Sequence, residues 1–60
     1  MNDVDAAQAE IRALTGEAIG SLRLISEGSG PLRRAQVTRL IREAFRALER
    51  ALALRTRLPP

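Results

Sequence analysis

SEGSGPLRR, residues 26–34, is the clearest break in this 60-residue chain and sets how its two halves can be arranged. It places two glycines and a proline between two long segments rich in Ala, Leu, Arg and Glu, which are residues that favour helices. Gly28 can take the left-handed conformation that ends a helix, and Pro31 suits the first position of the next helix. A connection of about four or five residues between two long helices places them side by side and antiparallel. The sequence therefore predicts a turn at 27–30 rather than an independent linker.

The segment before this turn, residues 3–26, repeats apolar residues at the helical period. These residues fall within an arc of about 80° when each residue advances the helix by about 100°. Gly16 and Gly20 lie inside the segment, and each costs roughly 1 kcal/mol relative to Ala in a helix. The apolar phase continues across both glycines, so we expect one uninterrupted helix, capped by Asn2 or Asp3. The apolar seam consists of Val4, Ala7, Ile11, Leu14, Ala18, Leu22 and Ile25.

A second face of the same segment carries only small residues at similar spacing. Small side chains let another backbone approach closely, whereas Ala at a solvent-exposed position is also what helix propensity favours. The two glycines, which helices disfavour, keep docking of another helix open as an alternative to simple exposure. The small residues are Ala6, Ala9, Ala13, Gly16 and Gly20.

The segment after the turn, residues 31–57, has a wider apolar face that covers roughly half of the expected helix surface. A helix of this length is about 40 Å long, and Pro59 and Pro60 end it. Arginines gather on the opposite side, where Glu43 and Glu49 flank them. The apolar residues of this segment are Val37, Leu40, Ile41, Ala44, Phe45, Leu48, Ala51 and Leu52, and the arginines are Arg39, Arg42, Arg46, Arg50 and Arg57.

Charge is distributed unevenly between the two halves of the chain. Residues 1–30 carry five acids and two arginines, a net charge of −3, whereas residues 31–60 carry eight arginines and two glutamates, a net charge of +6. Opposite net charges favour folding of the two halves against each other. All ten basic residues are Arg. Arg is the better bidentate partner for carboxylates and phosphates, although a coding preference for Arg over Lys explains the same count.

The small size of the chain points to self-association. Residues 1–60 are expected to form a single domain, which buries only about 60 % of its unfolded surface. The chain has no Cys and no His, so we expect neither disulfides nor a metal site. One neighbouring helix cannot cover the wide apolar face of the second helix, and soluble proteins rarely leave such a patch exposed.

The expected fold class is therefore all-α, a two-helix antiparallel hairpin that dimerises into a four-helix bundle with a twofold axis. The first helix is expected at about 3–26 and the second at about 31–57. The residues expected to form the seam with the other chain are Ile11, Leu14, Leu22, Ile41, Phe45, Leu48 and Leu52.

Catalytic chemistry has little support in the sequence. His, the commonest general acid–base group, is absent, and so is a Cys nucleophile. No base is available to activate the serines, and the glycine-containing stretches lack the length and the lysine of a phosphate-binding loop. We therefore expect no enzyme activity, no cofactor, no metal and no small-molecule substrate.

The expected function is a non-catalytic interaction or regulatory module that binds through helix packing, both to itself and to another protein. The alternative is a regulator that binds RNA or DNA through its arginines, although no aromatic residue accompanies them to stack on a base. Residues 1–12 lack the apolar region of a signal peptide, and the longest apolar run is ALAL at 51–54. A cytoplasmic location without a membrane partner is therefore expected. The candidate face for an anionic partner consists of Arg39, Arg42, Arg46 and Arg50.

Overall fold

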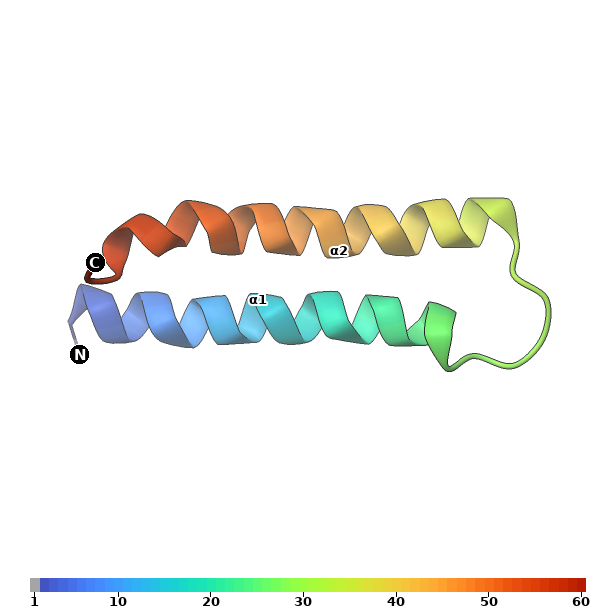
Figure 1. Cartoon of the computed structure of the whole chain (residues 1–60), viewed down its shortest axis with the longest axis horizontal. Coiled ribbons are helices and arrows are strands. Elements are labelled where there is room, and N and C mark those ends of the chain that lie inside the picture. Colours follow the sequence, from blue (N-terminus) through green and yellow to red (C-terminus); the bar gives the residue numbers. More distant parts are fainter. Residues whose placement is uncertain (1) are drawn as a thin grey trace.

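The computed structural model describes residues 2–60 and shows two long helices that lie side by side (Figure 1). Helix α1 spans Asp3–Ser26, α2 spans Arg34–Leu54, and a short 3₁₀ helix, η1, continues α2 over Arg55–Arg57. The helices run antiparallel, so the start of α1 and η1 lie at the same end of the molecule (Figure 1). No β-strand occurs within residues 2–60, and this part of the chain is an all-α hairpin 45 Å long.

Helix α1 covers the same residues as the first expected helix. The Asn2 side chain accepts a hydrogen bond of 2.8 Å from the backbone N–H of Asp5, which satisfies one of the unpaired donors at the helix start. Asp3 and Asp5 place negative charge in the first turn, where the helix dipole favours it. The helix continues without a break through Gly16 and Gly20, as the uninterrupted apolar phase predicts.

The connection between the helices is longer than the expected turn at 27–30. Helix α2 begins at Arg34 instead of residue 31, so the connection covers residues 27–33. Packed helices lie about 8–10 Å apart, and roughly three extended residues are needed to cross that gap. Pro31 therefore belongs to the crossing and not to the first turn of the helix, and Arg33 before the helix is still extended.

The prediction that Gly28 takes the left-handed conformation at the end of the first helix is wrong. The left-handed region is taken by Gly30, with φ of 95°, and not by Gly28. Helix α1 ends instead with Glu27 in a right-handed conformation, its backbone N–H donating to the Arg23 carbonyl at 2.8 Å. A Cβ at Gly28 would lie 2.6 Å from the Leu24 carbonyl oxygen. Gly28 is therefore required by close approach of the chain to the end of α1.

The second helix also ends earlier than expected, because regular α-helix stops at Leu54 and continues only as the 3₁₀ turn of η1. The Leu58 N–H donates to the Arg55 carbonyl at 3.0 Å, and the Arg55 guanidinium donates to the Leu52 carbonyl at 2.7 Å. Carbonyls of a last turn have no partner in the helix, so tightening of the backbone and a cationic side chain both satisfy them. Pro59 follows directly and has no N–H with which to extend the helix.

The core of the hairpin is one narrow seam between α1 and α2. Its side chains are mostly small, so the two helices approach closely and little large apolar surface is removed from water. Leu14 packs there with Ala18, Ala44 and Ala47, and Ala51 and Leu54 pack against this cluster. The buried residues are Ala7, Leu14, Ala18, Leu40, Ala44 and Ala47.

Neither helix within residues 2–60 combines the length and the apolar character that crossing a bilayer requires.

Candidate functional site

A row of large apolar residues lies on the surface of α2. We call Ile41, Phe45, Leu48 and Leu52 the apolar row; their exposed fractions are 43 %, 62 %, 46 % and 58 %. Their spacing of four, three and four residues keeps them on one stripe of the helix, about 16 Å long. The buried residues Leu40, Ala44 and Ala47 form a neighbouring stripe that faces α1. Helix α2 therefore has two apolar stripes, and its own α1 covers only one of them.

Helix α1 extends this exposed surface. On the opposite side of the seam, Glu10 pairs with Arg50, which shows which flanks of α1 and α2 lie together. At about 100° per residue, Leu22 lies on the flank of α1 opposite to Glu10. In the same way, the apolar row lies on the flank of α2 opposite to Arg50. Leu22, which is 43 % exposed, therefore flanks the seam on the same side as the apolar row. We call the apolar row together with Leu22 the apolar face.

The seven residues expected to form the seam with another chain fall into two groups. Leu14 is buried and Ile11 is half-buried between α1 and α2, so the hairpin itself already covers them. The other five, which are Leu22 and the four residues of the apolar row, remain on the surface. Of the seven residues expected to contact another chain, only these five are therefore available to a partner.

Sequence reasoning missed part of the seam inside the chain. In α1 the half-buried residue between Ala18 and Ile25 is Ser21, whereas Leu22 was expected there. In α2 the buried Ala47 and the half-buried Leu54 were not expected to face α1. A strict alternation of three and four residues would have found them, because it is the pattern of two helices packed along one seam. The seam positions are 4, 7, 11, 14, 18, 21 and 25 in α1, and 37, 40, 44, 47, 51 and 54 in α2.

The apolar face is not flat. Phe45, Leu48 and Leu52 line a small hollow together with Glu49. The walls of this hollow are almost entirely apolar, and Glu49 lies at its edge with a charged group that stays in solvent. A hollow of this kind on a helix surface can receive an apolar side chain of a second helix, as in knobs-into-holes packing.

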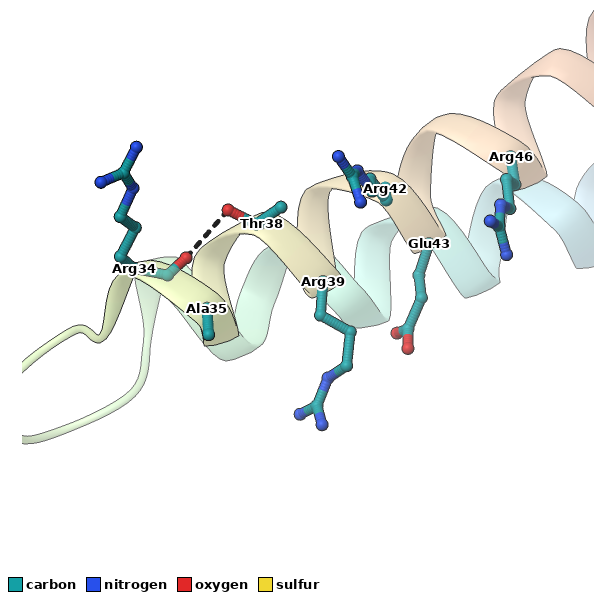
Figure 2. Close-up of a pocket in the computed structure, with 7 residues that line it drawn as sticks. All are labelled: Arg34, Ala35, Thr38, Arg39, Arg42, Glu43 and Arg46. Carbon is teal, nitrogen blue, oxygen red and sulfur yellow. Dashed lines mark hydrogen bonds between the residues drawn. The ribbon is translucent and has the colours of Figure 1, made fainter.

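A second surface feature is an open groove along α2 that is lined by arginines. We call it the arginine groove (Figure 2). Arg39 and Arg46 extend to the same side of the helix with Glu43 between them, whereas Arg34 points the other way (Figure 2). The Thr38 hydroxyl donates to the Arg34 carbonyl at 2.9 Å and so is directed along the helix. The groove is lined by Arg34, Ala35, Thr38, Arg39, Arg42, Glu43 and Arg46.

The four arginines expected to bind an anionic partner differ in whether they form an ion pair within the hairpin. Arg50 reaches across to Glu10 at 3.5 Å, so its charge is partly compensated inside the hairpin. Within residues 2–60 the other ion pair is that of Arg23 with Glu27, at 3.9 Å. Arg39, Arg42 and Arg46 form none in this part of the chain, although Glu43 lies beside them. Three guanidinium groups of the expected face are therefore available to an external anion.

Among residues 2–60 no polar or charged residue is buried, and no group of His, Cys, Asp or Glu is placed to hold a metal ion. No protein-family model matches the chain, and comparisons with curated proteins and with solved structures gave no match either. The proposals that follow rest on the apolar face and the arginine groove.

Proposed function

We propose that this chain is a small non-catalytic interaction module that acts through helix packing, and that it assembles as a homodimer. The observation that carries the proposal is the exposure of the apolar row. Burying apolar surface stabilises a protein by roughly 25 cal/mol for each Å² removed from water. In the isolated hairpin the apolar row contributes only part of this stabilisation, because between 43 % and 62 % of each of its residues remains exposed to solvent.

A second copy of the same chain fits this surface better than an unrelated polar partner does. An apolar face packs best on an apolar face, and a twofold axis brings the same patch of both copies together. The hairpin is 45 Å long and 17 Å wide. One broad side therefore covers roughly 770 Å² in projection, so the two copies need contact along most of their length to bury the ~800 Å² per partner that is typical of a stable complex. Two hairpins joined in this way form a four-helix bundle.

The dimer would leave the polar surface of both copies free. Its outer side carries the small residues of α1 and the charged residues of both helices. In this proposal a further protein binds to the outer surface. This binding gives the module its regulatory role. The apolar face serves assembly in this proposal, and the outer surface serves recognition.

Sedimentation equilibrium over a wide concentration range tests the proposal directly. Interference optics are suitable because the chain has neither Trp nor Tyr. We expect the mass of a dimer for the wild-type chain, and dissociation when a charge is placed in the apolar face by Phe45→Glu. Leu24→Glu is the matched control, because Leu24 is 61 % exposed and lines a groove on the other side of the hairpin.

Thermal unfolding followed by circular dichroism completes this test. If folding and assembly are coupled, the unfolding midpoint of the wild-type chain rises with protein concentration. Phe45→Glu should lower the midpoint and remove that dependence, whereas Leu24→Glu should preserve it. A wild-type chain that is helical and monomeric at every concentration would contradict the proposed dimer.

A further inference from the structure

We propose that Arg39, Arg42 and Arg46 bind the phosphate backbone of double-stranded nucleic acid along the arginine groove. The site lies on a different part of the α2 surface from the apolar row. It therefore goes beyond the proposed assembly and does not depend on it. The first support is that none of these three guanidinium groups forms an ion pair within the described chain.

The spacing of the three arginines suits a row of phosphates. Arg39 and Arg46 are seven residues apart, which corresponds to about 10 Å along a helix. Successive phosphates of one strand advance about 3.4 Å along the axis of a B-form duplex and also turn around it, so they lie farther apart in space than this rise, and the row reaches across neighbouring phosphates of one strand. Arg guanidinium groups bind phosphate oxygens through paired N–H donors. The groove therefore offers several contacts to one backbone.

The start of α2 adds positive potential at one end of the groove. Its first turn contains no acidic residue, and no side chain caps it. The unpaired N–H groups at the start of a helix carry partial positive charge, and anions are favoured there. Arg34 lies in this first turn and lines the groove as well. The helix start and the arginines therefore both attract an anion to this part of α2.

The composition of the groove favours nucleic acid over an acidic protein. Its other lining residues are Ala35, Thr38 and Glu43, so no large apolar or aromatic side chain is present. Protein interfaces derive most of their affinity from buried aromatic and apolar anchors, often together with Arg. Binding to a phosphate backbone needs positive charge and hydrogen-bond donors, and these the groove supplies.

A duplex fits better than a single strand for a related reason. Proteins that bind single strands stack bases on aromatic side chains. The one aromatic residue of the chain, Phe45, belongs to the apolar row and does not line the groove. The groove contains no Asn or Gln to read adenine edges, and its arginines are assigned here to phosphates and not to guanine, so we expect binding that is independent of base sequence.

Fluorescence anisotropy with a labelled 24-base-pair duplex tests the site, using DNA and RNA versions of one sequence between 50 and 200 mM salt. The groove variant is Arg42→Gln/Arg46→Gln. The matched control is Arg12→Gln/Arg23→Gln, which removes the same charge from exposed positions of α1. The groove variant should bind at least about tenfold more weakly, and its slope of log K against log salt should fall by about 1.8 for two lost phosphate contacts. The control should lose less than about threefold, because only general attraction is reduced.

Groove-dependent binding of either duplex supports the site, and the two arms show whether RNA or DNA is the better ligand. Equal losses in both variants would overturn it, because they would reveal attraction by net charge alone. Tighter binding to the single strand, or equal competition by polyglutamate at the same charge concentration, would also overturn it. Absence of binding at 50 mM salt would do the same. The replaced side chains are exposed, so circular dichroism and dimer mass should stay unchanged in both variants.

Discussion

Leu40 and Phe45 lie five positions apart in α2, yet Leu40 is 3 % exposed and Phe45 is 62 % exposed. Five residues turn a helix by about 140°, so the two side chains point to different surroundings. Leu40 lies in the seam against α1, and Phe45 lies in the apolar row. This relationship divides the apolar residues of α2 into one set that folds the hairpin and one set that is available to a partner.

Leu40→Ala and Phe45→Ala are therefore expected to act on different equilibria. Loss of a buried Leu side chain typically costs about 2–5 kcal/mol, so Leu40→Ala should lower the free energy of unfolding by an amount in that range. Phe45→Ala should instead weaken association, with an upper limit of about 3–5 kcal/mol if the dimer buries the ring completely. Urea denaturation followed by circular dichroism at two protein concentrations distinguishes these effects.

The distinguishing result is the concentration dependence. Leu40→Ala should shift both denaturation curves and leave the spacing between them, whereas Phe45→Ala should bring them closer together. If Phe45→Ala left both the mass and the melting curve unchanged, the apolar row would have no part in assembly.

Gly16→Ala and Gly20→Ala should each stabilise the protein. A Cβ at either position would meet no atom within 4 Å, and both residues lie inside α1. Replacing Gly by Ala in a helix interior gains roughly 0.5–1 kcal/mol, mainly because the unfolded chain becomes less flexible. The thermal midpoint of each variant measures the gain. A loss of stability would show that the small residues of α1 pack against another helix in the assembled protein.

Gly28→Ala should destabilise the protein even though the same change in α1 stabilises it. Its Cβ would lie 2.6 Å from the Leu24 carbonyl oxygen, and this backbone atom cannot move aside alone. Where the native geometry excludes a Cβ, the loss exceeds the usual gain of about 0.4–1 kcal/mol from Gly→Ala. Ser29→Ala is the control within the same connection, because Ser29 is exposed. Thermal unfolding should place Gly28→Ala well below both the wild type and Ser29→Ala.

The two helix starts should respond to substitution in opposite directions. Asn2→Ala removes the hydrogen bond to Asp5 and should cost about 1 kcal/mol of stability. Arg33 is already extended before α2 but has no capping side chain, so Arg33→Asn should gain a similar amount, about 1 kcal/mol. Chemical denaturation of each variant measures the change. An unchanged Arg33→Asn variant would show that the start of α2 does not accept a side-chain cap.

Much of the secondary structure could be predicted because it follows from local rules. The apolar period through Gly16 and Gly20 indicated one helix, and α1 is continuous there. The position of the connection could be predicted, but its length and backbone conformation could not. Gly28 and Gly30 are equally permissive in sequence, so only the structure shows that Gly30 takes positive φ. The distance between the packed helices explains why the crossing includes Pro31.

The candidate site could also be predicted only in part. The sequence identified the apolar residues of α2 but placed too many of them in one group. The small Ala44 and Ala47 lie in the seam, where they let the helices approach, and the larger Phe45 and Leu48 lie outside it. The arginines were also identified as one face, yet Arg50 turns to Glu10. Such a choice depends on which residues of another helix lie opposite, and this is a long-range property of the fold.

Local sequence alone was enough to predict two helices and the position of the break between them, and it shows which residues are apolar or cationic. These properties depend on neighbours within a few residues, through helical period, backbone preference and charge. The packing of α2 against α1 was needed to show which of the two apolar stripes of α2 is covered and which arginines form no ion pair within residues 2–60. Those outcomes depend on the rotation and register of α2 against α1, and close packing of small side chains along the seam sets both.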